Sequence, residues 1–223
     1  MEEDAELVVV LGGDGTILRC LSRFLGTGIP VIGVNFGRVG FLASMGPDEM
    51  DTGLLRAFAG ELRVFELPTL EVEVDGTRQT AVNDVVASSS TTGRMIEIAW
   101  SVGGEELGVQ PCDGIICATP SGSTAYNLSS GGPVLVWGLD AMAVTFVSPH
   151  SLHARPLVVP RGSELTVWNR TEDVAARVIA DGLAVGELAP DRRASIRLGE
   201  QTGVLATLPE MTFFRRYREI FAS

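Results

Sequence analysis

The feature that most constrains this chain is a short apolar run that ends in a glycine-rich turn and is followed at once by a helical pattern. Residues 7–11 (LVVVL) form a β-branched run of the kind found in strands buried on both faces. From 16 to 25 apolar residues recur at helical spacing, with arginine and serine on the opposite face. A second buried strand is predicted at 31–34 and a second helix at 48–58. This alternation predicts a small parallel α/β unit.

The pattern changes after Pro68. Residues 70–74 alternate apolar and charged, and the Asp75-Gly76 pair predicts a hairpin turn. Further short strands are predicted at 81–88, 95–102, 114–118, 143–147, 164–168, 176–180, 194–198 and 203–207. They indicate a β-rich domain of two packed sheets.

The domain organisation follows from these two patterns. We expect an α/β domain over 1–67 and a β-rich domain over 68–207. The apolar, arginine-rich stretch 213–221 predicts a helix, and we expect residues 208–223 to pack back on the first domain.

Composition excludes several classes of function. All 17 basic residues are arginine, so a Walker-type phosphate loop and Schiff-base chemistry, which both need lysine, are excluded. The net charge of −11, without basic clusters, disfavours nucleic-acid binding. No apolar run approaches the roughly 20 residues of a membrane-spanning helix, and the acidic start is unlike a signal peptide. Three cysteines without a CxxC pair indicate neither a disulfide framework nor a structural metal site. We therefore expect a cytoplasmic protein.

The first motif with chemical content lies between the first strand and the first helix, and comprises Gly12, Gly13, Asp14, Gly15 and Thr16. Glycines let a backbone approach a ligand closely, and the N-terminus of the following helix favours phosphate. A carboxylate beside a phosphate is repulsive unless it holds Mg²⁺ or accepts a proton from a nucleophile. The alternative is a tight turn in which Asp14 caps the helix. The dinucleotide pattern GxGxxG does not fit, and no acidic residue follows the second strand, which disfavours a dehydrogenase.

The second motif spans 113–133 (DGIICATPSGSTAYNLSSGGP), where a strand runs into a loop rich in hydroxyl side chains and glycine. Such residues suit hydrogen bonds to ribose or phosphate oxygens, and Tyr126 offers a ring for stacking on a base. The alternative is a polar loop that caps a short helix through Ser123 or Thr124.

A third candidate is the pair Asn83-Asp84, which interrupts an apolar strand. Polar residues in a buried strand need partners, so both are candidate ligand contacts, although a simple turn is the alternative. The histidines, His150 and His153, have no triad or metal-ligand spacing around them, and we expect structural roles for both. Cys112 and Cys117 are expected to be packed thiols.

Taken together, these segments resemble the NAD kinase family. The resemblance rests on LGGDGT, VIGVNFGRVGFL, Asn83-Asp84, the 113–133 segment, SPHSLHARP at 148–156, and Asp181-Gly182, and it extends from residue 7 to the C-terminus. It implies an enzyme that phosphorylates the 2′-hydroxyl of the adenosine ribose of NAD to give NADP. The donor would be ATP, used with Mg²⁺ or another divalent metal, or polyphosphate, and the protein would be a homo-oligomer (a dimer or tetramer). It also implies an active site in the cleft between two domains.

The resemblance also implies roles for individual residues. Asp14 would be the general base, and the phosphate-approach loop would be formed by Gly12, Gly13, Gly15 and Thr16. Phe41 would pack against adenine, Asn83 and Asp84 would hold the adenosine ribose, and Asp113 would reach the nicotinamide end in a neighbouring subunit. Arg94 would lie near the ligand. The dinucleotide would also contact Asp14, Gly15, Thr124, Ala125, Tyr126, Asn127, Leu128 and Ser129.

The sequence departs from the family pattern at three places. The family usually has one further strand–helix unit before the GGDGT strand, whereas this sequence begins at that strand, which bears on donor binding. Asp84 stands where glutamate is commoner, which shortens its reach by one methylene. Pro111 stands where a basic residue is often seen, which bears on contacts to the nicotinamide side.

Two other classes carry part of the same pattern. Lipid kinases of the diacylglycerol and sphingosine type share the GGDGT motif, but they predict a TGNDF-like second motif and a membrane-facing surface, which the sequence lacks. A non-catalytic NAD-binding protein would keep the dinucleotide contacts and form no NADP.

Overall fold

The computed structural model of the chain describes residues 5–37 and 40–222. The acidic start at 1–4 and positions 38–39 of the VIGVNFGRVGFL motif lie outside the described residues. The chain divides into a first unit, Met1–Leu67, Val136–Gly138 and Gln201–Ser223, and a second unit, Pro68–Leu135 and Leu139–Glu200. Residues 136–138 and 201–207, which the sequence analysis placed in the β-rich domain, thus belong to the first unit.

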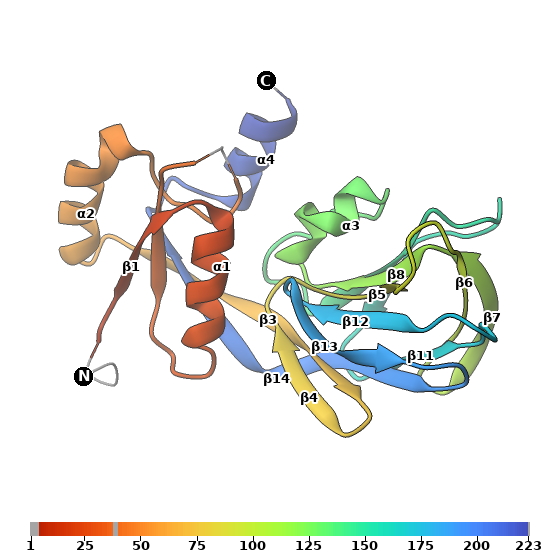
Figure 1. The fold of residues 1–223 in the computed structure, drawn as a ribbon. Coiled ribbons are helices and arrows are strands. Elements are labelled where there is room, and N and C mark those ends of the chain that lie inside the picture. The colour runs from red at the N-terminus through yellow and green to blue at the C-terminus, as the bar shows by residue number, and fades with distance from the viewer. Residues whose placement is uncertain (1–4, 38–39, 223) are drawn as a thin grey trace. The chain divides into compact units, whose positions relative to one another are not determined.

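The first unit is built on a short parallel sheet (Figure 1). Its helices and strands are β1 (Val8–Gly12), α1 (Asp14–Arg23), β2 (Val31–Asn35), the 3₁₀ turn η1 (Pro47–Glu49), α2 (Met50–Phe58), the end of β14 (Arg193–Thr207) and α4 (Phe213–Phe221). Strand β2 pairs in parallel with β1 on one edge and with β14 on the other. Its core contains Ile32, Val34, Met45, Ala57, Ala206 and Leu208.

The predicted return of the C-terminal helix to the first domain is confirmed. The ring of Phe213 in α4 lies 5.6 Å from the ring of Phe41, and both residues belong to the first unit. The predicted helix at 16–25 is observed as α1, two residues earlier, so Asp14 is its first residue.

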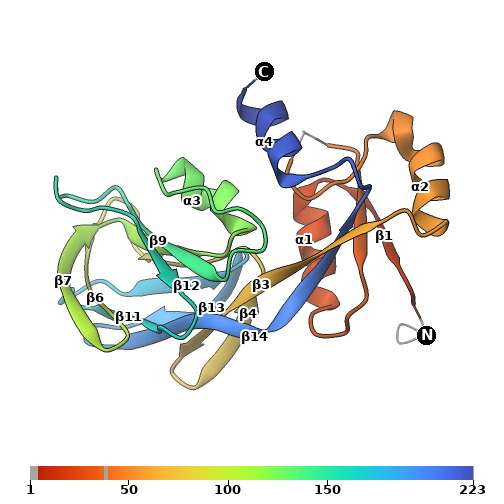
Figure 2. The ribbon, with the colours of Figure 1, turned by 180° about the vertical axis from the view of Figure 1, so that it is seen from behind.

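The second unit consists of antiparallel strands in two sheets (Figures 1 and 2). Its elements are β3 (Arg63–Val74) from Pro68 onward, β4 (Thr77–Ala81), β5 (Asp84–Ser89), β6 (Ile96–Val102), β7 (Glu105–Cys112), β8 (Gly114–Ala118), η2 (Gly122–Thr124), α3 (Tyr126–Ser129), β9 (Ala141–Val147), β10 (Leu157–Pro160), β11 (Leu165–Asn169), β12 (Ala176–Ala180), β13 (Leu183–Leu188) and β14 up to Glu200. One sheet has the order β10-β9-β8-β5-β12-β13, and the other contains β14-β11-β6-β7 together with the β3–β4 hairpin. Inward-facing apolar residues of both sheets, such as Ile96, Ile115, Met142, Leu165 and Val178, form one large core.

The predicted hairpin turn is confirmed in detail. Val74 pairs with Thr77, and between them Asp75 and Gly76 have φ of 46° and 81°. Two consecutive residues at positive φ are the requirement of a type I′ turn, which explains the Asp-Gly sequence.

Other strand predictions were incomplete. The predicted strands 194–198 and 203–207 are one continuous strand, β14, and three strands, β7, β10 and β13, were not predicted. Most residues of β7 and half of those of β13 are exposed, so these strands lack the apolar pattern on which prediction depends. Within the described part of the chain, none of the helices combines the length and hydrophobicity needed to cross a bilayer.

Candidate active site

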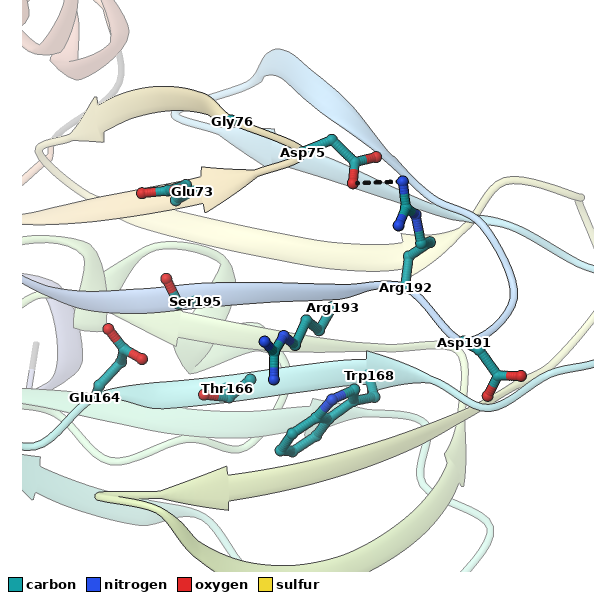
Figure 3. Close-up of a pocket in the computed structure, with 10 residues that line it drawn as sticks. All are labelled: Glu73, Asp75, Gly76, Glu164, Thr166, Trp168, Asp191, Arg192, Arg193 and Ser195. Carbon is teal, nitrogen blue, oxygen red and sulfur yellow. Dashed lines mark ion pairs between the residues drawn. The ribbon is translucent and has the colours of Figure 1, made fainter.

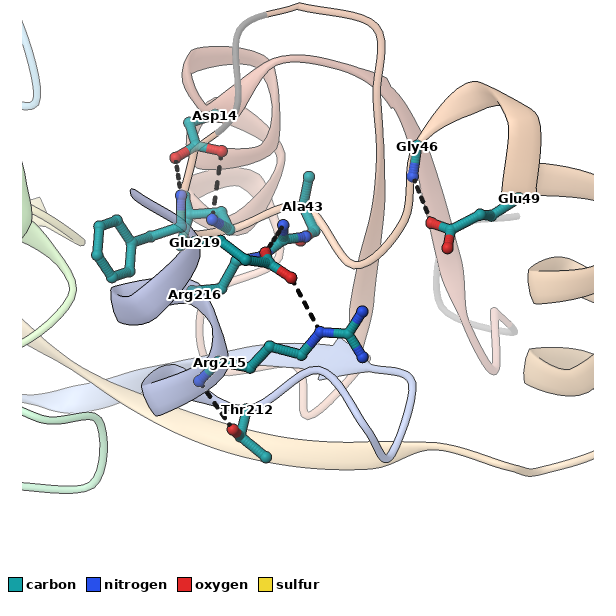
Figure 4. Close-up of polar contacts among 10 residues, drawn as sticks. Asp14, Ala43, Gly46, Glu49, Thr212, Arg215, Arg216 and Glu219 are labelled. Carbon is teal, nitrogen blue, oxygen red and sulfur yellow. Dashed lines mark hydrogen bonds and ion pairs between the residues drawn. The ribbon is translucent and has the colours of Figure 1, made fainter. Parts of the chain in front are cut away.

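The carboxylate of Asp14 is fixed by backbone amides from a distant loop. Its Oδ2 accepts the N–H of Phe41 at 2.7 Å, and its Oδ1 accepts the N–H of Leu42 at 3.2 Å (Figure 4). The N-cap of α1 is Gly13, so the alternative in which Asp14 merely caps its own helix is wrong. A Cβ atom at Gly40 would collide with this carboxylate, so the loop approaches Asp14 closely only because glycine stands there.

The glycines of the GGDGT motif differ in the space around them. Gly13 has an extended backbone (φ −95°, ψ −178°) that any residue can adopt. A Cβ at Gly12 would lie 2.8 Å from Thr16, whereas Cβ atoms at Gly13 and Gly15 would meet nothing within 4 Å. At Gly13 and Gly15, the backbone at the N-terminus of α1 is therefore not covered by side chains. Such an uncovered helix N-terminus is suited to binding a phosphate group.

Phe41 is packed into an aromatic cluster of the first unit. Its ring lies 5.6 Å from Phe213 and 5.9 Å from Phe221, and only 6% of the residue is exposed. The predicted contact between Phe41 and adenine would therefore require these rings to move, and it stays a prediction.

A residue that the sequence analysis did not select, Arg216 of α4, lies next to the Asp14 loop. Its guanidinium donates through Nη2 to the carbonyl oxygen of Ala43 and through Nη1 to Glu219 at 3.1 Å (Figure 4). Burial lowers the pKa of Arg216, while the carboxylates of Glu219 and Asp14 act to raise it. The available signal was its place three residues after Phe213, which puts both on one helix face.

In the second unit, Asn83 and Asp84 are held by another aspartate. The carboxylate of Asp181 accepts the N–H groups of Val82 at 2.7 Å, Asn83 at 2.8 Å and Asp84 at 3.1 Å. The prediction of one strand over 81–88 is wrong, since β4 ends at Ala81 and β5 begins at Asp84. The reason is that Asp181 supplies acceptors for amides that would otherwise need a strand partner.

Asp84 has a perturbed acidity. Burial, and secondly the negative charge of Asp181, raise the pKa of Asp84 from 3.8 to about 6. Burial also raises the pKa of Asp181, although its three amide donors act in the opposite direction. Two neighbouring carboxyl groups are therefore partly desolvated at this position, and Asp84 can hold a proton close to neutral pH.

The loop after β8 is joined to the Asn83 segment. Thr119 donates to the carbonyl oxygen of Val82 at 2.6 Å, and Ser121 donates to Oδ1 of Asn83 at 3.0 Å. A Cβ atom at Gly122 would collide with the backbone carbonyl of Asn83. The structure thus brings together two of the three predicted motifs, and Gly122 is what permits their close contact.

Residues of this loop differ in how free they are to bind a ligand. Asn127 is buried, and its side chain donates to the carbonyl oxygens of Ser123 and Pro133 and accepts from Thr145. Leu128 is partly buried and Thr124 bonds to the carbonyl oxygen of Ser121, whereas Ala125, Tyr126 and Ser129 are exposed. Tyr126, 45% exposed, keeps a ring face for stacking.

The capping alternative for this loop is wrong. The N-cap of α3 is Ala125, which has no side-chain acceptor. The Ser123 hydroxyl instead donates to the carbonyl oxygen of Pro120 at 2.7 Å and accepts the N–H of Leu135 at 2.9 Å.

Two predicted ligand residues lie away from the Asn83 segment. In the β5–β8 pair, Asp84 is opposite Ala118, whereas Asp113 bonds to Ser89 at the other end, roughly 17 Å away at about 3.4 Å per residue. Arg94 is exposed and forms an ion pair with Asp173 at 2.8 Å.

Of the remaining reactive side chains, the two cysteines are packed as predicted, whereas the structural roles expected for the two histidines stay a prediction. His150 and His153 are exposed. Cys112 and Cys117 are buried in the second-unit core, and burial raises the pKa of both thiols, to about 12 for Cys112. Protonated, packed thiols are poor nucleophiles.

One groove of the second unit lies apart from the predicted site residues. It has a volume of about 650 Å³ and is lined by Glu73, Asp75, Gly76, Glu164, Thr166, Trp168, Asp191, Arg192, Arg193 and Ser195 (Figure 3). Arg192 and Asp75 form an ion pair across it at 3.4 Å. Over residues 5–37 and 40–222, no three His, Cys, Asp or Glu side chains gather as a metal site would require.

Comparison with known proteins places this arrangement in a family. The sequence profiles of the ATP-NAD kinase N-terminal and C-terminal domains match residues 1–62 and 82–207. The NAD kinase of Heliobacterium modesticaldum is 39% identical over 224 residues, covering 96% of this chain and 77% of the relative. That of Gemmatimonas aurantiaca is 37% identical, covering 96% and 76%.

Solved structures agree. An NAD kinase from Archaeoglobus fulgidus, determined in complex with ATP, has a TM-score of 0.80 at 31% identity, covering 99% of this chain and 83% of that one. Yeast NADH kinase, determined with NADH, shares the fold with a TM-score of 0.88 at 24% identity, covering 97% and 67%. The chain belongs to the NAD kinase family.

Proposed function

We propose that this chain transfers a phosphoryl group from ATP to the 2′-hydroxyl of the adenosine ribose of NAD, giving NADP and ADP. Membership of the NAD kinase family supports this reaction. The structural observation that carries it is the carboxylate of Asp14, which two backbone amides hold at the open N-terminus of α1. A carboxylate beside a phosphate group is repulsive, and its presence at this turn is explained if it accepts the proton of the nucleophile.

In this reaction Asp14 accepts the proton of the 2′-hydroxyl as the oxygen attacks the γ-phosphorus. The bond between the γ-phosphorus and the bridging oxygen breaks, and ADP leaves. A ribose hydroxyl is a weak nucleophile at neutral pH, so a fixed acceptor within hydrogen-bond reach is the needed component. The amides of Phe41 and Leu42 fix the carboxylate, and the N-terminal turn of α1 offers its open face at Gly13 and Gly15 to the phosphates.

The second unit would supply recognition of NAD. Asn83 and Asp84 are proposed to bind the adenosine ribose, and Tyr126 to stack on a base with Thr124, Ala125 and Ser129 around it. The hydrogen bonds from Asp181 and Ser121 to the Asn83 segment support this assignment, since they fix the segment for binding. Asn127 is proposed to shape the loop, because its side chain is fully used within the protein.

Three further properties belong to the proposal. A divalent metal, Mg²⁺ or a similar ion, would arrive with ATP as part of the substrate. The protein would act as a homo-oligomer, which fits the distance between Asp113 and the Asn83 segment, since Asp113 would then serve a neighbouring subunit. The acidic composition and unpaired cysteines support a cytoplasmic location.

The test is NADP formation by the purified chain from NAD, ATP and Mg²⁺, followed with an NADP-specific dehydrogenase. Asp14→Asn is the variant, and Asp51→Asn, an exposed aspartate of α2 in the same unit, is the matched control. We expect NADP from the parent and from Asp51→Asn, and almost none from Asp14→Asn. A parent that binds NAD in calorimetry and forms no NADP with ATP or polyphosphate is a binding protein, and the proposal is then wrong.

A further inference from the structure

We propose that Arg216 is a positioning residue, which holds the loop at 41–43 and thereby the carboxylate of Asp14 in the geometry needed for proton transfer. This inference rests on the proposed function, because it assigns Arg216 a role in the same reaction. Arg216 itself would touch neither substrate.

The first observation is a continuous set of hydrogen bonds. Phe41 and Leu42 donate their N–H groups to Asp14, and the carbonyl oxygen of the next residue, Ala43, accepts from Arg216 (Figure 4). One short stretch of backbone is therefore bound to the carboxylate on its amide side and to the guanidinium on its carbonyl side. A shift of Arg216 must move Ala43, and with it the two amides that orient Asp14.

The second observation is that helix α4 is itself fixed. Thr212 caps it by accepting the N–H of Arg215 at 3.2 Å, and Glu219 bonds both Arg215, at 2.9 Å, and Arg216, at 3.1 Å. Its rings Phe213 and Phe221 pack on Phe41. The helix thus holds the loop by the side chain of residue 41 and by the carbonyl group of residue 43.

The third observation concerns charge. Arg216 is only 7% exposed, and a buried guanidinium is costly unless neighbouring groups compensate it. The charged side chains that act on it are Glu219 and Arg215 of its own helix and Asp14 of α1. Coulomb attraction is mutual, so the positive charge of Arg216 stabilises the negative charge that Asp14 must carry to accept a proton. An apolar side chain could fill the same space as Arg216, but only a cation can produce this electrostatic effect.

The experiment compares Arg216→Met and Arg216→Lys with Arg218→Met, an exposed arginine on the same helix, in steady-state NADP formation. We expect Arg216→Met to lower kcat roughly 10- to 100-fold while KM for NAD stays within about threefold, since misplaced catalytic groups cost rates of this order. We expect Arg216→Lys to recover part of kcat and Arg218→Met to match the parent.

Two further measurements separate positioning from loss of structure. In the Asp14→Asn background, Arg216→Met should lower the residual rate by less than about twofold, because it acts through Asp14. Hydrogen exchange at the amides of Phe41 and Leu42 should quicken in Arg216→Met, and less in Arg216→Lys.

An equal loss in both backgrounds, or a kcat within twofold of the parent, overturns the inference. So does a kcat of Arg216→Lys that is no higher than the kcat of Arg216→Met. A parent that makes no NADP overturns the proposed function instead, and the exchange measurement then still decides whether Arg216 holds the loop.

Discussion

Two aspartates, one in each unit, use their carboxylate to hold the backbone amides of a distant segment. They differ in how many hydrogen bonds the carboxylate accepts. Asp14 accepts two backbone amides from 41–42, one on each carboxylate oxygen. Asp181 accepts three from 82–84, two of them on Oδ1. A carboxylate has about four lone-pair sites, so within the described residues the two hydrogen bonds of Asp14 leave more of these sites open to a ligand than the three of Asp181 do.

The backbone around Asp14 is also more open than the backbone around Asp181. Asp14 opens a helix beside glycines whose faces are uncovered, whereas Asp181 sits at φ 47° in the tight turn between β12 and β13. The comparison suggests a division of roles in this molecule: the aspartate that accepts three amides in a tight turn fixes structure, and the one that accepts two beside open backbone is available for chemistry. The four predictions below test that division, from the largest expected effect to the smallest.

The largest effect is expected at Asp14. Asp14→Asn should lower kcat by roughly 10²–10⁴-fold, because it removes the proton acceptor. The free energy of unfolding should change by only about 1 kcal/mol, since the amide oxygen still accepts one of the two N–H groups. Steady-state kinetics and urea unfolding measure the two quantities. If the free energy of unfolding falls by several kcal/mol together with kcat, Asp14 is a structural residue like Asp181.

Asp181 should behave in the opposite way. Asp181→Ala leaves three partly buried amides without their acceptor, so we expect a loss of roughly 3 kcal/mol in the free energy of unfolding. Because the Asn83 segment loses its support, KM for NAD should rise more than kcat falls. The matched control is Asp191→Ala, since Asp191 also lies in a turn at positive φ (59°) but is exposed. Equal destabilisation by both substitutions would mean that the turn conformation matters and the three hydrogen bonds do not.

The pH dependence of stability sharpens the comparison at Asp84. The pKa of Asp84 in the folded chain is about 6, above its ordinary 3.8, so ionising it costs more in the folded than in the unfolded chain. The contribution of protonated Asp84 to the free energy of unfolding is fully present below about pH 4 and is lost as the pH rises through about 6. Asp84→Asn lacks this dependence, and its stability relative to the parent should increase by about 1 kcal/mol between pH 5 and pH 8. Urea unfolding at the two pH values measures it, and a constant difference would contradict the raised pKa.

The smallest effect is expected at Arg94. Its ion pair with Asp173 is exposed, and such pairs contribute at most about 1 kcal/mol, so Arg94→Ala should leave stability nearly unchanged. If Arg94 lies near the bound dinucleotide, KM for NAD should rise in Arg94→Ala and not in Asp173→Ala. The same KM in parent and both variants would remove Arg94 from the proposed site.

Much of this architecture was accessible from local sequence. The apolar run before the glycine motif predicts β1, the helical spacing after it predicts α1, and Asp75-Gly76 predicts a type I′ hairpin, because each depends on a few neighbouring residues. Exposed strands such as β7 have no such pattern, and neither the sequence nor its composition indicated them.

The partners of the site residues could not be predicted in this way. Asp181 accepts hydrogen bonds from residues 82–84, which precede it by 97 to 99 positions in the sequence. Its role therefore depends on the pairing of β12 with β5. Arg216 stands in an arginine-rich helix, and only packing decides that it is buried while Arg218 is exposed. The fixing of Asp14 by Phe41 and Leu42 likewise depends on the path of the loop after β2.

The composition of the first unit from distant segments has a consequence for synthesis. Its sheet and its hold on the Asp14 loop use residues from the segment 201–222, which is synthesised after the second unit. Until they emerge, β2 lacks a neighbour on one edge and the Asp14 loop lacks the α4 helix, so the nascent first unit must wait exposed while the second unit is made. A chain cut short before α4 would hold every residue of the glycine motif and still lack the support that orients its aspartate. Catalytic competence in this protein would thus require that translation has passed α4.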